Sequence, residues 1–308
     1  MGTSYSVKAS YLPEQIHSEQ LKADIEALLE WINDRMSTYR QTSELSVFNA
    51  NRSVDWQPVS QALYDVLDSA LKISERTNGA FDITVGPLVN LWGFGPDPAT
   101  FKAPPDETIR EQMTRVGFRH VQLRKEPLSV KKSLPDLYLD LSAIAKGYGV
   151  DQVGQLLEKQ GITDYLVEIG GELRLRGHKP DGSAWRIAIE KPSPDQRMIQ
   201  KIVPVTDVAM ATSGDYRNFF EYEGVRFSHT IDPRTGRPIS HNLASVTILS
   251  ESTMLADAWA TAFMVLGADE GFRLAESENM AVLFIVKTNE GFDEISTTAF
   301  KQYLKAEQ

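Results

Sequence analysis

The stretch YLVEIGGELRLR, Tyr165–Arg176, decides the fold class. Apolar and polar side chains alternate on both sides of a double glycine, which predicts two short strands, Tyr165–Ile169 and Leu173–Arg176. Glycine adopts positive φ without strain, so the pair suits a tight turn between antiparallel strands. The same freedom would let a ligand approach the backbone, and both interpretations stay open at this point.

The rest of the chain continues this mixture of short strands and helices. Further strands are expected at Thr3–Tyr11, His120–Arg124, Leu128–Val130, Leu137–Leu139, Trp185–Glu190, Ile202–Met210, Arg226–Ile231, Ala244–Leu249 and Met280–Lys287. Helices are expected at Pro13–Asp34, Ser60–Thr77, Asp106–Gly117, Ser142–Gln160, Ser252–Gly267 and Asp269–Ser277. Many connections have hairpin length, so we predict an α+β fold with mixed, largely antiparallel sheets and packed helices. Only the loop Trp92–Pro105 resembles a boundary, and a single domain over residues 1–308 is expected.

The composition excludes several classes of protein. The 308 residues include 42 acidic and 32 basic ones, and the net charge of -10 argues against non-specific binding of nucleic acid. The absence of cysteine excludes thiol nucleophiles, disulfides, iron–sulfur clusters and structural zinc fingers. No apolar run approaches the roughly 20 residues that span a bilayer. The P-loop, GxGxxG, HExxH and GxSxG motifs are also absent.

Two predicted helices carry residues that could bind a phosphate or a metal ion. Ser142 is expected to cap one helix, and Lys146 would lie one turn inside it, where the helix N-terminus attracts anions. On the apolar helix Met254–Leu266, Asp257 and Thr261 share one face. A buried carboxylate needs a partner, and Mg²⁺ prefers carboxylate and hydroxyl oxygens. An exposed lysine, and an aspartate bonded to backbone or to an arginine, are the alternatives.

A third segment, SHTIDPRTGRP at Ser228–Pro238, combines turn chemistry with many ionisable side chains. His229, Asp232, Arg234 and Arg237 lie within nine residues, although a turn requires none of them. A histidine titrates near neutral pH and could act as a general base, but a histidine at a strand end is more often structural. Both interpretations remain open.

Together these segments resemble the ApbE family of flavin transferases, over nearly the whole chain. The resemblance rests on seven segments in the family's order: MGTSYSV (Met1–Val7), SELSVFN (Ser43–Asn49), GAFDITVGPLVNLWGFG (Gly79–Gly95), DLSAIAKGYGVD (Asp140–Asp151), EIGGEL (Glu168–Leu173), HTIDPRTGRP (His229–Pro238) and LADAWATA (Leu255–Ala262). It implies a T-fold-like architecture. It also implies an FAD:protein FMN transferase, which cleaves the FAD pyrophosphate, attaches FMN to a threonine of an acceptor protein by a phosphoester bond, and releases AMP.

The resemblance further implies partners and a location. The implied acceptors are subunits of Na⁺-translocating NADH:quinone reductase and of RNF-type electron-transport complexes. The implied location is periplasmic, at the inner membrane, with a signal peptide and a lipid-bearing cysteine that would precede Met1. An FAD pyrophosphatase and a flavin-binding protein without turnover remain the alternative functions.

By position, the resemblance implies a set of site residues. The implied FAD contacts are Met1, Asn78, Gly79, Ala80, Asp140, Lys146 and Ile231. The implied Mg²⁺ ligands are the main-chain carbonyl of Ala143 and the side chains of Asp257 and Thr261. Among the catalytic residues we expect His229 as general base, with Asp257 or Asp232 as alternatives.

Overall fold

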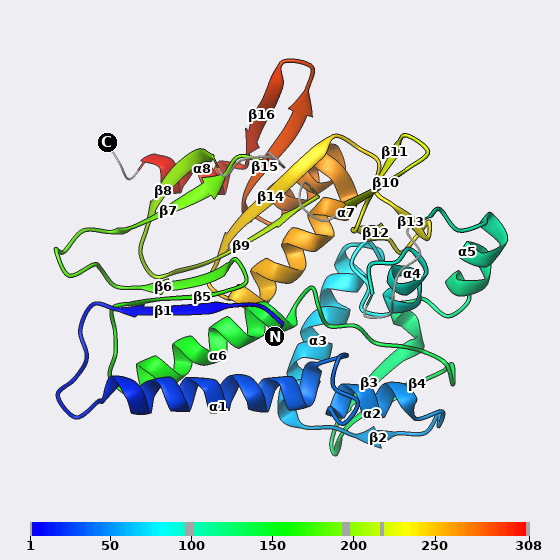
Figure 1. Ribbon diagram of the computed structural model, residues 1–308, viewed down its shortest axis with the longest axis horizontal. Helices are drawn as coiled ribbons and strands as arrows, with labels where there is room; N and C mark the ends of the chain where they lie inside the picture. The colour runs from blue at the N-terminus through cyan, green and yellow to red at the C-terminus, as the bar shows by residue number, and fades with distance from the viewer. Residues whose placement is uncertain (1, 96–101, 193–197, 216–218, 306–308) are drawn as a thin grey trace. The chain divides into compact units, whose positions relative to one another are not determined.

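The computed structural model describes residues 2–95, 102–192, 198–215 and 219–305 (Figure 1). The chain forms two compact units. The first consists of Met1–Trp31, Ile144–Tyr216 and Asn242–Gln308, and the second of Ile32–Ala143 and Arg217–His241. Each unit is described by itself.

A seven-stranded sheet forms the centre of the first unit, with the strand order β1-β5-β6-β9-β14-β15-β16 (Figure 1). The strands are Tyr5–Ala9 (β1), Tyr165–Ile169 (β5), Glu172–Arg176 (β6), Val208–Gly214 (β9), Leu243–Ser250 (β14), Ala281–Thr288 (β15) and Gly291–Ser296 (β16). Each neighbouring pair is antiparallel, which confirms the predicted α+β class.

The hairpin β5–β6 forms as the sequence predicts. The buried apolar residues of β5 and the apolar residues of β6 lie on opposite faces of the sheet. Ile169 pairs with Glu172 across Gly170 and Gly171, whose φ values are 61° and 104°. On β5 the buried apolar residues face the helices, whereas on β6 the helix side carries charged residues. These charged residues are Glu172, Arg174 and Arg176.

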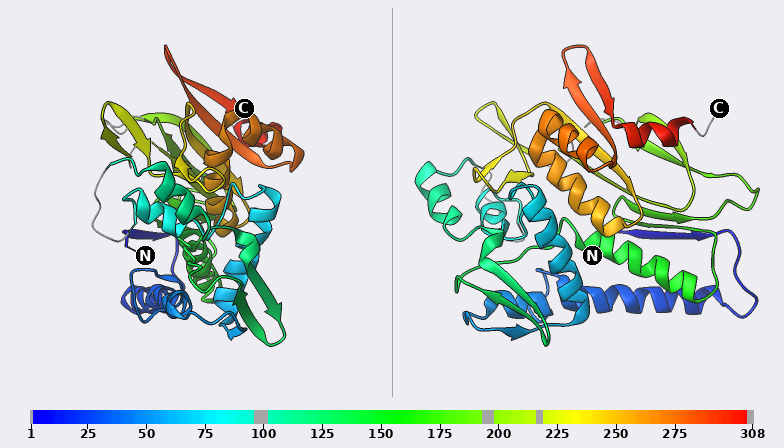
Figure 2. Two further views of the ribbon diagram at one scale, coloured as in Figure 1. Left: turned by 90° about the vertical axis from the view of Figure 1, so that its right-hand side faces the viewer. Right: turned by 180° about the vertical axis from the view of Figure 1, so that it is seen from behind.

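Helices cover one face of this sheet, and a ribbon with a short helix covers the other (Figure 2). The helix side consists of the start of α1 (Ser18–Met36), α6 (Ala145–Lys159) and α7 (Thr253–Ser277). The other side consists of the ribbon β7 (Trp185–Glu190) and β8 (Ile199–Val205) with α8 (Thr298–Lys305). Because both faces are covered, the central strands β14 and β15 are buried almost throughout.

The part of α7 before Gly267 is nearly all apolar and mostly buried, as the sequence predicts. Ser252 caps it by accepting the N–H of Leu255. Gly267, with φ 79° and ψ 177°, interrupts the helix and divides it into two parts. The predicted pair of helices, Ser252–Gly267 and Asp269–Ser277, is thereby confirmed.

The second unit combines helices with small sheets. Its helices are α2 (Glu44–Ala50), α3 (Gln61–Arg76), α4 (Gly86–Leu91), α5 (Asp106–Met113) and the 3₁₀ turn η1 (Phe118–His120). Its strands are β2 (Gln57–Pro58), β3 (Val121–Lys125), β4 (Leu128–Lys132), β10 (Phe219–Tyr222), β11 (Val225–Ser228), β12 (Ile231–Asp232) and β13 (Arg237–Pro238). They form the sheets β2-β4-β3, β10-β11 and β12-β13. Part of its core consists of Leu88, Trp92, Ile109, Phe220 and Ile231.

Several predictions about local structure were wrong. The expected strand Arg226–Ile231 is two strands, β11 and β12, in different sheets. The helix expected at Pro13–Asp34 begins at Ser18, and the helix expected at Asp106–Gly117 ends at Met113.

Leu137–Leu139 forms no strand, because side chains rather than a neighbouring strand bind its backbone. The predicted strand Ile202–Met210 is two strands, β8 and β9, separated by a turn in which Asp207 has φ 48°. Helix α6 begins at Ala145 rather than directly after Ser142.

The prediction of a single domain over residues 1–308 stays a prediction. Among the residues that the structure describes, no helix combines the length and apolar character that crossing a bilayer requires.

Candidate active site

Helices α6 and α7 cross with their backbones in contact, and this crossing builds the candidate site. Gly147, in the first turn of α6, faces Thr253 and Met254 at the start of α7. A Cβ atom at residue 147 would lie 2.7 Å from the Cα of Met254, so a larger residue would push the helices apart. This glycine therefore brings the two helix starts together.

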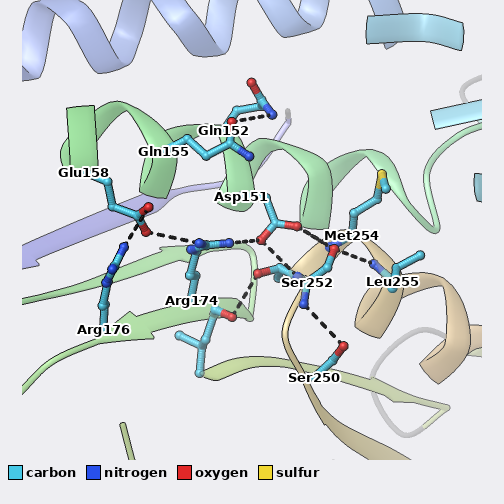
Figure 3. Close-up of polar contacts among 12 residues, drawn as sticks. Asp151, Gln152, Gln155, Glu158, Arg174, Arg176, Ser250, Ser252, Met254 and Leu255 are labelled. Carbon is cyan, nitrogen blue, oxygen red and sulfur yellow. Dashed lines mark hydrogen bonds and ion pairs between the residues drawn. The ribbon is translucent and has the colours of Figure 1, made fainter. Parts of the chain in front are cut away.

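Each helix caps the other. The carboxylate of Asp151, on α6, accepts the backbone N–H groups of Thr253 and Met254, both at 3.0 Å (Figure 3). In return, Oδ2 of Asp257 on α7 accepts the N–H of Gly147 at 3.1 Å. A carboxylate at a helix N-terminus satisfies free N–H groups and favours the helix dipole. The two aspartates thus fix how far each helix can slide along the other.

Arg174 on β6 ties this crossing to the sheet (Figure 3). Its guanidinium donates to Asp151 at 3.0 Å, to Glu158 at 3.1 Å and to the hydroxyl of Tyr165 at 3.0 Å. Glu158 also accepts from Tyr165 at 2.6 Å and pairs with Arg176 at 2.8 Å. Burial alone would raise the pKa of Glu158, but these donors outweigh it and hold the pKa below its usual value.

Lys146 lies between two carboxylates at the inner end of the crossing. Its Nζ is 3.2 and 3.3 Å from the oxygens of Asp257 and 3.3 Å from Oε1 of Glu172. The lysine side chain is 27% exposed, whereas those of Glu172 and Asp257 are 6% and 4% exposed. Lys146 and Asp257, both expected site residues, are thus in direct contact, and the lysine is the most accessible residue of the three.

The cluster has more carboxylates than cations. Burial, followed by the charge of Asp257, raises the pKa of Glu172 to about 8 against the opposing effect of Lys146. Burial would lower the pKa of Lys146, but the two carboxylates hold it above its usual value. Oε2 of Glu172 is buried and accepts no hydrogen bond. A second buried carboxyl group with a spare acceptor oxygen is therefore present, and an added positive charge nearby would favour its ionised form.

Thr261 extends the site along α7. It lies one turn beyond Asp257, so the two side chains share a face of the helix. Its Oγ1 is 3.3 Å from Oγ of Ser213 on β9. Because a threonine hydroxyl that binds a ligand through oxygen must direct its hydrogen elsewhere, Ser213 can orient it. Ser213 belongs to none of the motifs in the sequence.

The glycine turn and the N-terminal segment meet at Lys146. A Cβ atom on Gly170 would lie 2.8 Å from Cγ2 of Thr3 and 3.4 Å from Cδ of Lys146. Gly170, with φ 61°, therefore turns the hairpin and leaves room for Thr3, while the lysine stem passes at ordinary contact distance. Met1, an expected FAD contact, lies outside the described residues.

The second unit holds the other expected FAD contacts. Asn78 and Gly79 follow α3 with φ values of 48° and 81°, and Ala80 is buried. The backbone N–H of Asp140 donates to the carbonyl of Ile83 at 2.7 Å. The two sequence segments that carry these contacts are therefore neighbours in this unit.

Ser142 does not cap α6, contrary to expectation. Its N–H and its hydroxyl both donate to Oδ1 of Asp140, and α6 starts three residues later without a side-chain cap. Lys146 consequently lies in the first turn rather than one turn inside. Ala143, whose carbonyl is an expected Mg²⁺ ligand, is the last residue of the first segment of the second unit.

Asn49 and Lys132 hold the segment that leads to Asp140. The Asn49 side chain accepts the N–H of Leu139 at 2.8 Å and donates to its carbonyl at 2.9 Å. Nζ of the fully buried Lys132 donates to the carbonyls of Asn49 and Leu137 at 3.4 and 3.3 Å. The SELSVFN segment thus acts as a clamp on the backbone, which sequence reasoning missed.

The segment at 228–238 forms a tight, well-bonded turn. Asp232 accepts from the backbone N–H and the guanidinium of Arg234, at 2.9 and 3.0 Å, so this alternative base already has strong partners. Ile231 is buried in the core of the second unit, and the indole of Trp92 donates to the carbonyl of Gly236. The ring of His229 lies 6.3 Å from that of Phe94, edge to face.

Comparison with known proteins identifies the family. The model of the ApbE family matches residues 1–284. The chain belongs to the ApbE family.

Its relatives include a protein named FAD:protein FMN transferase from Vibrio cholerae, 50% identical over 99% of this chain and 90% of the relative. One of the same name from Escherichia coli K12 is 41% identical over 94% and 84%. The solved structure of the flavin transferase ApbE from Vibrio cholerae matches with a TM-score of 0.92 and 48% identity, covering 98% of this chain and 96% of that one. The apo flavinyl transferase ApbE from Pseudomonas stutzeri matches with a TM-score of 0.89 and 40% identity, covering 98% and 94%.

The comparisons confirm the family and the α+β class that the sequence predicts. The roles assigned to single residues stay predictions. In this ApbE protein the structure joins Lys146, Asp257 and Thr261 within the first unit, while Asn78–Ala80, Asp140, Ala143, His229 and Ile231 belong to the second.

Proposed function

We propose that this ApbE protein is an FAD:protein FMN transferase. The observation that carries the proposal is the cluster of Lys146, Glu172 and Asp257 at the α6–α7 crossing. A cationic lysine at a helix start is suited to a phosphate, and the carboxylates keep it charged. The relatives also support the proposal, because two proteins named FAD:protein FMN transferase are 41% and 50% identical to this chain over nearly its whole length.

The residues of the cluster fit a divalent cation. Asp257 offers a carboxylate, Thr261 a hydroxyl and, by family resemblance, Ala143 a main-chain carbonyl, which are oxygen ligands that Mg²⁺ accepts. The unsatisfied Oε2 of Glu172 favours an added positive charge, and so does the nearby charge of Asp257, which helps to raise the pKa of Glu172. When bound, Mg²⁺ would neutralise charge that develops on the pyrophosphate oxygens.

In the proposed reaction the hydroxyl oxygen of an acceptor threonine forms a bond to the FMN phosphorus of FAD. The bond between that phosphorus and the oxygen of the AMP phosphate breaks, and AMP leaves. The threonine proton passes to a ring nitrogen of His229, our candidate general base. Lys146 Nζ neutralises phosphate charge, and the α6–α7 crossing holds it in place.

The proposal is tested by supplying the protein with FAD, MgCl₂ and an acceptor that carries the target threonine. Covalent FMN and free AMP should appear in equal amounts, and replacement of the acceptor threonine by alanine should abolish both. Asp257→Ala should lose activity with its circular dichroism unchanged. Asp181→Ala, which removes an exposed aspartate of the same unit, should remain active.

Other outcomes would change the assignment. AMP with free rather than covalent FMN would make the protein an FAD pyrophosphatase, and bound FAD without AMP would make it a flavin-binding protein. His229→Ala should slow transfer while FAD affinity stays the same. A loss of FAD affinity in that variant would instead make His229 a positioning residue.

We extend the proposal to the acceptors and the location implied by the family resemblance. Subunits of NADH:quinone reductase and of RNF-type complexes are the first acceptors to test. Flavinylation of either in a strain that contains this protein, and its loss on deletion, would support the choice. The periplasmic, lipid-anchored location can be examined by fractionating cells that express the full-length precursor.

A further inference from the structure

Glu172 is held rigidly at the site by the turn and by the sheet. It is the first residue of β6, directly after Gly171, and the next residue, Leu173, pairs with Met210 of β9. Its side chain points to the helix face, where Oε1 lies 3.3 Å from Lys146 Nζ. Its Oε2 is buried without a partner. A buried acceptor with spare capacity next to an ammonium group is costly unless the site uses it.

A divalent cation at Asp257 would compete with Lys146 for the same oxygens. Both carboxylate oxygens of Asp257 face the lysine, at 3.2 and 3.3 Å, and one of them also accepts the N–H of Gly147. A cation and an ammonium group repel each other, so the lysine must give up at least part of this contact. The lysine has three donors on a flexible stem and needs another anion to remain in the site.

We propose that Glu172 is a positioning residue that retains Lys146 at the site when a divalent cation occupies Asp257. The inference rests on the proposed function, because it takes a cation at Asp257 and an FAD phosphate at Lys146 as given. Gly170 supports the arrangement, since its positive φ forms the turn that leads into Glu172 at the start of β6. The EIGGEL segment thus presents the anion from a rigid turn.

The proposal predicts an effect of Glu172 that depends on the cation. Without a cation, both oxygens of Asp257 stay available to Lys146 after Glu172 is replaced, so Glu172→Gln should bind FAD as the wild type does. With MgCl₂, the variant lacks the anion that retains the lysine, and its FAD affinity should fall about tenfold. A purely structural role of Glu172 would change both affinities alike.

The experiment measures the dissociation constant of FAD by fluorescence titration, in EDTA and in excess MgCl₂. Glu294→Gln is the matched control, because Glu294 also pairs with a lysine, Lys201 at 2.8 Å, but on β16 at the edge of the same sheet. It should behave as the wild type in both buffers. Lys146→Met should bind FAD weakly in both, and adding Glu172→Gln to it should cause no further loss.

Glu172→Asp tests the charge with a smaller change of shape. It keeps the carboxylate one methylene shorter and should restore most of the affinity in MgCl₂. If circular dichroism shows that the glutamine variant is unfolded, Glu172→Asp is compared with the wild type instead: a larger loss of affinity in MgCl₂ than in EDTA supports the proposal, and equal losses overturn it.

The outcomes separate this inference from the proposed function. Equal losses in EDTA and MgCl₂, or no loss in either, would overturn the role of Glu172. If Mg²⁺ affects FAD binding in the wild type but not in Asp257→Asn, the cation site stands whatever Glu172→Gln shows. If the wild type and Asp257→Asn respond to Mg²⁺ alike, the cation site at Asp257 is wrong, and the inference is overturned with it.

Discussion

Replacement of Asp151 by alanine should lower the free energy of unfolding of the first unit by about 3–5 kcal/mol. The side chain of Asp151 is only 10% exposed and accepts from Arg174, from the hydroxyl of Ser252 and from two backbone N–H groups at the start of α7. Alanine leaves all of these donors without the acceptor. Hydrogen bonds to a charged group contribute about 1.5–3 kcal/mol each. The total loss is smaller than their sum, because Arg174 still donates to Glu158 and water can bind some of the freed donors.

Two further variants scale this effect. Asp151→Asn keeps one acceptor oxygen but loses the charge, so its loss should be about half that of alanine. Ser252→Ala removes the hydroxyl that caps α7 by accepting the N–H of Leu255, and the loss of such a cap typically costs about 1 kcal/mol. The exposed Asp181→Ala should leave the unfolding midpoint unchanged. The order of the variants therefore tests whether the mutual capping carries the stability.

Urea unfolding followed by circular dichroism measures the effect, with the slope as a check on the surface exposed. If the two units unfold in separate transitions, only the transition of the first should move. Because Asp151 fixes the start of α7 and hence Asp257 against Lys146, the alanine variant should also bind FAD more weakly. A loss of stability below about 1 kcal/mol would refute the capping argument, since an ordinary surface change accounts for that much.

Three other predictions follow from the same unit. Glu158→Gln should lower stability at neutral pH and make stability depend less on pH in acid. The depressed pKa of Glu158 contributes stability at pH values above the ordinary pKa of 4.5, and this contribution is lost as the pH falls through the lower pKa of the folded state. Unfolding midpoints measured over a series of acid pH values check this. Ser213→Ala should weaken Mg²⁺ binding in calorimetry, because Ser213 contacts the hydroxyl of Thr261. Ser245→Ala is the control and should not weaken it, because Ser245 lies on the adjacent strand β14 and its buried hydroxyl has no hydrogen-bond partner. Gly147→Ala should cost about 1–3 kcal/mol in urea unfolding, because the new methyl group would press on the backbone of α7; unchanged stability would mean that the helices do not touch there.

The sequence predicts most of the regular structure because periodicity reports burial. Helix α3 lies within one residue of its prediction at each end, capped by Ser60 as expected. The break of α7 follows Gly267, which lacks the side chain that would oppose its positive φ. Where neighbouring side chains bind the backbone, periodicity fails. Leu137–Leu139 has the composition of a strand but is held by Asn49 and Lys132.

The candidate site was predictable only in part. An aspartate in an apolar helix requires a partner, and this argument alone singles out Asp257. Its partner Lys146 stands out by its place at a helix start. Glu172 and Asp151 escape such reasoning, because charged residues at every second position of a strand, or on one side of a helix, normally face water.

One signal for the buried charges does exist in the sequence. Along β5 the buried apolar residues Val167 and Ile169 lie on one face and Leu166 on the other, where Leu173 and Leu175 of β6 also lie. A hairpin with its apolar residues on both faces must be covered on both faces. Glu172 and Arg174, at the start of β6, therefore lie under a helix and are paired there.

The spacing of the family segments follows from the way the two helices pack. Gly147 and Asp151 lie one turn apart on α6, and Thr253 and Asp257 lie one turn apart on α7. Because Gly147 donates to Asp257 while Thr253 donates to Asp151, these two pairs bond crosswise, and neither segment is complete alone. The bonds place Lys146, the residue before Gly147, against Asp257, so the position of the charges is set by backbone contacts rather than by flexible side chains. A change in either pair should consequently disturb ligand binding and stability together, whereas a change of Glu172 should disturb binding alone.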